Sequence, residues 1–172
     1  MTLSDLRKRI LMEAQRSKLR EVGSALREAM AKSCKEHRLI WGVVECARQL
    51  ENSPDEVMVC ILPETLPTQY YTPMAIQHTL MKAYCQEHEI PVIKVVSISP
   101  VSEIFKKGEC MAANDGNKSS SHPLLERKSS NALDFSCFLI KKSHALSQSE
   151  YCIQVYCDDV SRDKEMVIEL PS

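Results

Sequence analysis

Glycine is scarce in this chain of 172 residues, which has only four glycines, at positions 23, 42, 108 and 116. No two of them form the glycine-rich loop that cradles a phosphate, so a dinucleotide-binding fingerprint and a Walker loop are both excluded. The chain also lacks a Gly-x-Ser-x-Gly sequence, the sharp turn that carries the nucleophile of α/β-hydrolases. The common phosphate-binding and hydrolase sites are therefore absent.

A large net charge and long apolar runs are missing as well. The formal net charge of −1 argues against a protein dominated by nucleic-acid electrostatics. The charge is uneven, because residues 1–40 hold ten Lys and Arg against five Asp and Glu, which leaves −6 for the rest. No apolar run reaches the ~18 residues of a membrane span, and the first residues do not form the apolar stretch of a secretory signal. We expect no membrane partner.

Cysteine is present, but without the spacing of a metal or redox motif. The eight cysteines, at 34, 46, 60, 85, 110, 137, 152 and 157, include no Cys-x-x-Cys pair. Most of them fall inside apolar segments, as buried free thiols do. We expect a reducing compartment, the cytosol or the nucleus.

The pattern of apolar residues predicts alternating helices and strands. Amphipathic periodicity and start signals predict helices over 17–37, 41–51, 73–88 and 147–157, and a short one from Ser99. Apolar runs predict strands at 57–62, 91–96, 135–140 and 166–170. This order indicates an α/β protein, a three-layer α/β/α sandwich with a central mixed sheet of about four to five strands.

The same pattern divides the chain into an extension and one domain. Residues 1–16 are predicted to be a basic N-terminal extension, and 17–172 a single α/β/α domain. Residues 108–131 are rich in Ser, Asn, Gly and Lys, which predicts a flexible surface loop that proteases cut first.

Two arrangements of chemistry-bearing side chains are conceivable. His78, Cys85 and His88 lie within about 80° of one another on a helix, as zinc or copper ligands would. A thiol among Cys60, Cys85 and Cys152 could act as a nucleophile with His144 as its base. Closed zinc sites need a fourth ligand, and nothing in the sequence pairs the thiols with the histidine. We therefore expect no metal, no cofactor and no catalytic site.

The helix predicted at 73–88 has an unusually wide apolar face. Its apolar residues span an arc of about 200°, against the ~100° needed to face one core. They are Met74, Ile76, Leu80, Met81, Ala83, Tyr84 and Cys85. Two interpretations remain open: the helix is packed by its neighbours within one chain, or one face contacts the sheet and another contacts a second chain.

An ordered series of segments gives the chain a family resemblance. The segments are WGVVECARQL at 41–50, PDEV at 54–57, CIL at 60–62, IQHTLMKAYC at 76–85, IPVIKV at 90–95 and VIELP at 167–171. The series resembles the growth arrest and DNA-damage-inducible stress proteins over about residues 18–106 and 133–171. Their fold is that of the ribosomal and kink-turn RNA-binding proteins.

The resemblance implies a regulator without catalytic activity, found in the nucleus and the cytoplasm. Members of the family bind and activate a mitogen-activated protein kinase kinase kinase, and contact the replication sliding clamp and cyclin-dependent kinase complexes in growth arrest, DNA-damage response and apoptosis. They also form dimers or higher oligomers through the helices that match 41–51 and 73–88. The resemblance assigns a dimer interface to Val43, Val44, Ala47, Met74, Gln77, Leu80, Met81 and Tyr84.

Two segments depart from the family pattern. The loop after the first predicted strand is densely acidic in relatives, but here Glu64 is its one carboxylate. We assign partner binding in this loop to Glu64, Gln69, Tyr70 and Tyr71, with the tyrosines either anchoring a partner or packing back on the domain. In the second departure, the 108–131 loop carries RKSS at 127–130, which is either a phosphorylation site or an ordinary solvated stretch.

RNA binding is the alternative function. RNA-binding members of the superfamily carry Gly-x-Asn-Glu-x-x-Lys, and the matching stretch here is GVVECAR at 42–48. Glu45 and a basic Arg48 are retained, but Val44 replaces the Asn whose amide would contact RNA. With a charge of −6 beyond residue 40, we do not expect a nucleic-acid partner unless the basic N-terminal helix supplies the contacts.

Overall fold

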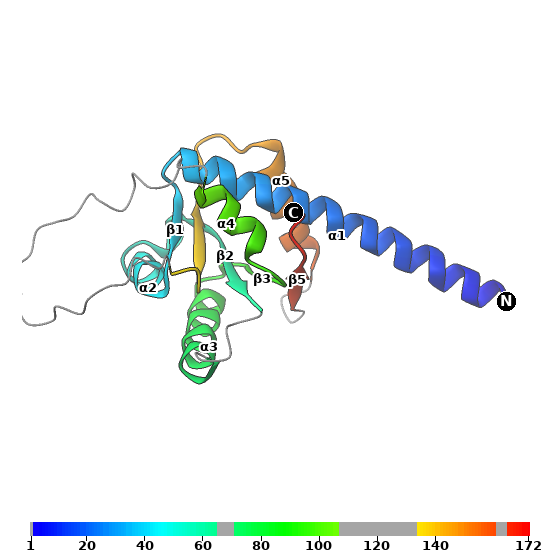
Figure 1. The fold of residues 1–172 in the computed structure, drawn as a ribbon, viewed down its shortest axis with the longest axis horizontal. Coiled ribbons are helices and arrows are strands. Elements are labelled where there is room, and N and C mark those ends of the chain that lie inside the picture. The colour runs from blue at the N-terminus through cyan, green and yellow to red at the C-terminus, as the bar shows by residue number, and fades with distance from the viewer. Residues whose placement is uncertain (1, 65–70, 107–133, 161–164) are drawn as a thin grey trace, which may run out of the picture.

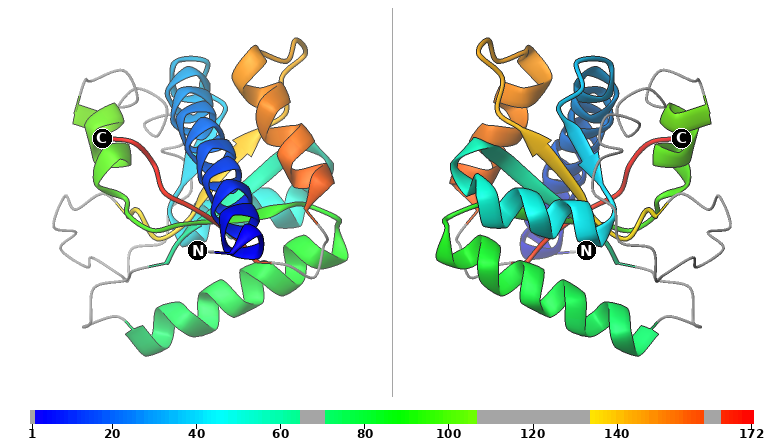
Figure 2. Two further views of the ribbon diagram at one scale, coloured as in Figure 1. Left: turned by 90° about the vertical axis from the view of Figure 1, so that its right-hand side faces the viewer. Right: turned by 90° about the vertical axis from the view of Figure 1, so that its left-hand side faces the viewer.

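The computed structural model describes residues 2–64, 71–106, 134–160 and 165–172, which form five strands covered by helices (Figure 1). Helices α1 (Leu3–Lys35), α4 (Ser99–Lys106) and α5 (Gln148–Asp159) lie on one side of the sheet. Helices α2 (Val43–Asn52) and α3 (Tyr71–Glu87) lie on the other side (Figures 1 and 2). The expected α/β/α sandwich with a mixed sheet is confirmed.

The sheet has the strand order β1-β4-β2-β3-β5. At its centre, β2 (Val57–Pro63) runs parallel to β3 (Val92–Val95) and antiparallel to β4 (Phe138–Lys141). The edge strand β5 (Met166–Ile168) is parallel to β3, and β1 (Leu39–Trp41) is antiparallel to β4. Strand β1 was not predicted, because three residues between two helices carry too short a pattern to recognise.

The two faces of the sheet bury two separate cores. Since successive side chains of a strand point to opposite faces, Val59 and Ile61 of β2 join the core beneath α1, α4 and α5. Their neighbours Cys60 and Leu62 join the smaller core beneath α2 and α3. All four side chains are at most 1% exposed, as expected for a strand covered by helices on both faces.

Helix α1 is much longer than the part that packs on the domain. Its buried residues begin only at Val22, and the exposed segment before them projects beyond the other elements (Figure 1). At Gly23 the helix passes so close to the C-terminal segment that a Cβ would collide with the carbonyl oxygen of Glu169. The basic extension is therefore a continuation of α1, which starts at Leu3 rather than near residue 17.

Helix α5 begins with the capping box that its sequence indicates. The Ser147 hydroxyl accepts a hydrogen bond from the Glu150 backbone N–H, and the Glu150 carboxylate accepts one from the Ser147 backbone N–H. The carboxylate is fully buried and also pairs with Arg38 at 2.8 Å. Arg38 in turn donates to the carbonyl oxygen of Lys141 at the end of β4. This network joins α5, the start of β1 and the end of β4.

Candidate interaction surface

Helices α2 and α3 form a groove of about 510 Å³ on the outer side of their layer. We call it the α2/α3 groove. It is lined by Val43, Val44, Ala47, Arg48, Leu50, Glu51, Gln77, Leu80, Met81 and Tyr84. Most of these side chains are apolar, with one positive and one negative residue among them.

The groove has a buried floor and exposed apolar walls. Leu50 and Met81, at 2% and 6% exposure, belong to the smaller core and form the floor. Val44 on α2 and Leu80 on α3 are 65% and 64% exposed, and Ile76, one turn before Leu80, is 57% exposed. Large apolar side chains held this open to solvent on neighbouring helices are typical of a surface that binds another protein.

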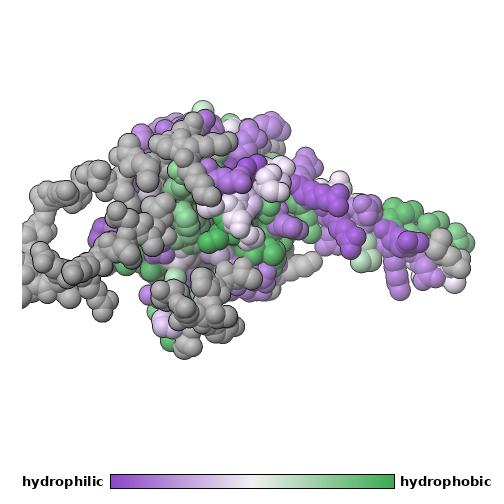
Figure 3. Space-filling view, viewed as in Figure 1, coloured by the Kyte–Doolittle hydropathy of each residue, from purple (hydrophilic) through white to green (hydrophobic). Residues whose placement is uncertain are grey.

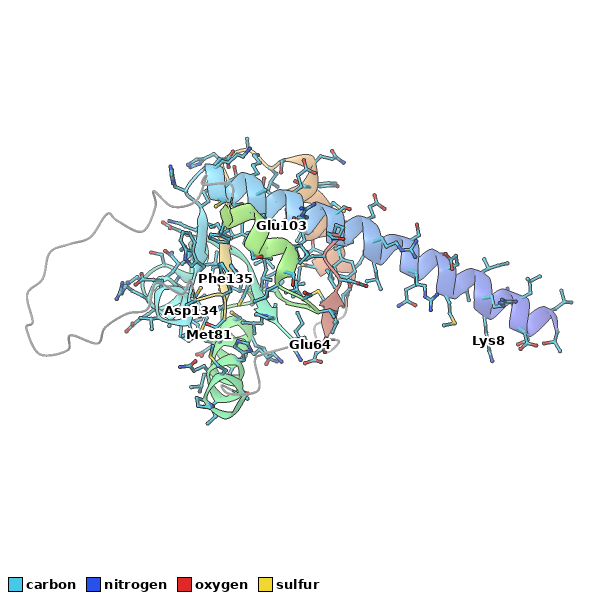
Figure 4. The ribbon with its side chains drawn as sticks, in the orientation of Figure 1. Lys8, Glu64, Met81, Glu103, Asp134 and Phe135 are labelled. Carbon is cyan, nitrogen blue, oxygen red and sulfur yellow. The ribbon has the colours of Figure 1, made fainter. Side chains whose placement is uncertain are left out.

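The structure brings together seven of the eight residues that the resemblance assigns to a dimer interface. Val43, Val44 and Ala47 come from α2, and Gln77, Leu80, Met81 and Tyr84 come from α3. Met74 is half-buried and does not line the groove. Met81 (labelled in Figure 4) lies in the core beneath the groove, so most of its side chain is not accessible to a partner.

The wide apolar arc of α3 thus divides into two faces. Met81 and Cys85 point into the core, whereas Ile76 and Leu80 are exposed and Tyr84 is half-buried, its ring stacked on His88. Packing by neighbours within one chain, the first of the two interpretations, does not account for the whole apolar arc, because the described residues leave Ile76 and Leu80 uncovered.

Three groove residues were missed from the sequence. Arg48, Leu50 and Glu51 all lie on α2. A signal was available, because Arg48 follows Val44 and Glu51 follows Ala47 by four residues, the spacing that places side chains on one helix face. Arg48 also pairs with Glu45 at 2.7 Å, so the two charges beside the groove are held together.

The N-terminus of α2, where the RNA-binding signature would lie, is occupied by a carboxylate of this chain. Gly42 has a φ of +86°, and the Val43 N–H donates to the Asp134 carboxylate at 3.1 Å. The second carboxylate oxygen accepts from the Ser136 N–H at 3.0 Å. Asp134 lies beside α2 in Figure 4. A negative charge at this helix start opposes an incoming RNA phosphate, which weakens the RNA alternative.

The predicted partner-binding loop is described only at its two ends. Glu64 is exposed just after β2, where its N–H donates to the carbonyl oxygen of Val95. Tyr71 is the first residue of α3 and not a loop residue, which corrects that part of the prediction. Gln69 and Tyr70 lie outside the described residues, as does the whole 108–131 loop.

The three residues considered as metal ligands are not arranged as a metal site. His78 Nε2 lies 2.7 Å from the carbonyl oxygen of Ser136, and burial holds the pKa of His78 below its ordinary value. Cys85 is fully buried, while the His88 ring stacks on Tyr84 on the outside of the helix. Among the described residues, no three His, Cys, Asp or Glu side chains are placed to hold a metal ion.

The thiols considered as nucleophiles all have a raised pKa, which favours their protonated form. The neighbouring thiol of Cys60, together with burial, raises the pKa of Cys85, and the thiol of Cys137 raises that of Cys60. Burial raises the pKa of Cys152 as well. Since the thiolate is the reactive form, these cysteines are poor nucleophiles at neutral pH. His144 is exposed in the connection between β4 and α5.

No helix in the described parts of the chain combines the length and apolar character needed to cross a membrane.

Comparisons with known proteins agree on one family. Residues 24–119 match the family described as ribosomal protein L7Ae/L30e/S12e/Gadd45. The chain is 28% identical over 109 residues to growth arrest and DNA damage-inducible protein GADD45 gamma of Bos taurus, covering 63% of this chain and 69% of that protein. It is 28% identical over 93 residues to the GADD45 alpha of Homo sapiens, covering 54% of this chain. That match spans only 56% of the relative's length.

Proposed function

Because the chain belongs to the ribosomal protein L7Ae/L30e/S12e/Gadd45 family, we propose that it is a stress-response regulator that acts by binding other proteins and not by catalysis. The names of its GADD45 relatives support a role in growth arrest and the response to DNA damage. The proposed finer role is that of an adaptor that binds and activates a mitogen-activated protein kinase kinase kinase in the nucleus and the cytoplasm. Contacts with the sliding clamp and cyclin-dependent kinase complexes are part of the same proposal.

The observation that carries this proposal is the α2/α3 groove. Its walls expose Val44 and Leu80 although the same helices bury Cys46, Leu50 and Met81 beneath them. A second copy of the chain placed against this groove would cover both exposed side chains. Because the contact would be made by the same patch on both copies, it is of the kind that closes a symmetric dimer. We propose that the chain self-associates through this groove.

Self-association gives the adaptor a physical route to kinase activation. A kinase held inactive by its own regulatory segment is shifted towards its open state by a partner that prefers that state. A dimer that holds two such kinases also raises their effective concentration for each other without any new contact. Activation is therefore expected to depend on the intact groove.

The test introduces a charge at the centre of the groove. Leu80→Glu places a carboxylate in a contact that excludes water, and a symmetric contact contains the change twice. We expect the variant to keep its circular dichroism and cooperative melting, and to elute from size exclusion later than the wild type, as a monomer. In stressed cells, the tagged wild type should recover a kinase of the proposed class, and the variant should activate it less.

Thr79→Glu is the matched control. Thr79 is also exposed on α3, one residue away and outside the groove, so it adds the same charge without touching the proposed contact. It should elute with the wild type. A folded Leu80→Glu protein of unchanged size would remove the groove from self-association. Recovery of no such kinase by the wild type would refute the adaptor role.

A further inference from the structure

The first half of α1 is a second surface without a structural role in the domain. Every residue from Thr2 to Lys18 is exposed, and Figure 1 shows this part of the helix extending away from the sheet. Lys18 pairs with Asp159 of α5 at 3.0 Å, which marks where the helix meets the domain. We call residues 3–16 the projecting α1 segment. At 1.5 Å per residue it is about 20 Å long.

The projecting α1 segment exposes apolar side chains on more than one side. Leu3, Leu6 and Ile10 are 87%, 44% and 61% exposed and share one stripe, since they are spaced by three and four residues. Leu11 is about 100° away from Ile10, and Met12 lies on the side opposite to the stripe. Both are exposed, at 64% and 58%. A flat surface would cover the stripe and leave Met12 in water.

The same segment is strongly basic. Residues 1–20 hold six Lys and Arg against two Asp and Glu, a charge of +4, which leaves −5 for the rest of the chain. Arg7, Lys8 and Arg16 point to different sides of the helix, as their helical positions require. Figure 3 shows hydrophobic and hydrophilic residues side by side on this projecting part, and Figure 4 labels Lys8 there. Two copies of the segment would repel each other, whereas an acidic partner would be attracted.

The segment is already folded as a helix up to its first residue. The Thr2 hydroxyl accepts a hydrogen bond from the Asp5 N–H, and the Asp5 carboxylate accepts one from the Thr2 N–H at 3.0 Å, a complete capping box. A partner that recognises a helix therefore need not order this one first, which removes a large part of the usual cost of binding.

We propose that the projecting α1 segment is a docking helix for an acidic protein that encloses it, namely a calcium-loaded EF-hand sensor. Such sensors open on binding calcium and expose methionine-lined grooves, which take the apolar side chains of a basic amphipathic helix. An enclosing partner covers Leu6 and Ile10 on one side and Met12 on the other, and its carboxylates meet basic residues on all sides. A planar anionic bilayer would cover one side only, and lying along the helix it would also meet the acidic domain.

The experiment titrates the full chain with purified calmodulin in a calorimeter, in calcium and again in a calcium chelator. We expect binding at about 10 μM or tighter in calcium, and none in chelator. The double variant Leu6→Glu, Ile10→Glu should bind calmodulin at least about tenfold more weakly. Its two new carboxylates replace apolar contacts and are repelled by the acidic groove. Both residues are exposed, so the double variant keeps the wild-type melting temperature. Leu80→Glu should bind calmodulin as the wild type does, which separates this surface from the α2/α3 groove.

Two results would overturn the proposal. One is the absence of calcium-dependent binding, or equal binding by the wild type and the Leu6→Glu, Ile10→Glu variant. The other comes from co-sedimentation with vesicles of phosphatidylcholine and phosphatidylserine. If the wild type binds the anionic vesicles more tightly than it binds calmodulin, and the double variant has lost binding to the vesicles, the segment is a membrane-surface helix instead.

Discussion

The two helical layers of this protein cover the same sheet in different ways. In the layer of α1, α4 and α5, Leu26 is fully buried on an amphipathic helix whose apolar side faces the larger core. In the layer of α2 and α3, Leu80 is 64% exposed although its neighbour Met81 is buried. Where α1 packs on the sheet, its apolar side faces the larger core, whereas α2 and α3 leave Val44, Ile76 and Leu80 exposed above the smaller core.

The two layers also differ in the polar groups that they bury. The larger layer buries the Glu150 carboxylate with Arg38, a closed network that ties α5 to the sheet. The smaller layer buries the thiols of Cys46, Cys60, Cys85 and Cys137, which are small and make only weak hydrogen bonds. The larger layer is thus tied to the sheet by a polar network, whereas the smaller layer packs on it through apolar and thiol side chains.

Leucine truncation should give the largest difference between the layers. Leu26→Ala removes a fully buried side chain and leaves a cavity, so it should lower the free energy of unfolding by about 3 kcal/mol. Leu80→Ala should change that free energy by less than about 0.5 kcal/mol in the monomer, because the side chain is already in water. Urea unfolding of both variants at low protein concentration measures the contrast. Equal losses would mean that Leu80 is covered within one chain.

Glu150→Gln tests the polar network of the larger layer. It replaces a fully buried charge that pairs with Arg38, so we expect a loss of about 2 kcal/mol in the free energy of unfolding. Burial alone would raise the pKa of Glu150, but the hydrogen bonds from Ser147 and the ion pair with Arg38 hold it below 4.5. The carboxylate therefore contributes fully above about pH 4.5, and its contribution is lost as the pH falls through the lower, folded value.

The measurement is urea unfolding of wild type and variant from pH 7 down to pH 3. The difference in the free energy of unfolding between the wild type and Glu150→Gln should be constant near neutral pH and should become smaller below about pH 4. A difference that grows in acid would mean that the folded protein does not stabilise the charged form of Glu150.

Gly42→Ala perturbs the start of α2 in the smaller layer. With a φ of +86°, Gly42 adopts a backbone conformation that side chains disfavour, and a Cβ would lie 3.3 Å from the Asp134 carboxylate. We expect a loss of about 1–2 kcal/mol in the free energy of unfolding. Thermal melting of the wild type and of Gly42→Ala measures the loss, and an unchanged melting temperature would show that the Gly42 conformation carries no special strain.

How far the sequence predicts this molecule depends on how distant the interacting residues are. The cap of α5 was predicted because Ser147 and Glu150 lie three residues apart, and the α/β/α layers followed from local periodicity. Strand β1 was missed because its three residues form a strand only through pairing with β4, which is distant in the sequence. The exposed and buried faces of α3 could not be separated, since its wide apolar arc does not say which side the sheet covers. Seven of the residues that the resemblance assigns to a dimer interface nevertheless lie together along the α2/α3 groove.

The cap of α2 shows the same limit and gives the smallest predicted effect. Its partner Asp134 is 91 positions away from Val43, so no local pattern could reveal it. Asp134→Ala removes the acceptor of the Val43 and Ser136 N–H groups and should lower the free energy of unfolding by about 1 kcal/mol, the usual effect of losing a helix cap. Asp134→Asn keeps an acceptor oxygen but loses the charge, so its free energy of unfolding should fall between those of the wild type and Asp134→Ala.

The same two variants also test the RNA alternative. If the Asp134 carboxylate keeps RNA away, both variants should bind kink-turn RNA no more weakly than the wild type in a gel shift. Weaker binding by either variant would show that Asp134 supports RNA contact, contrary to its position at the helix start.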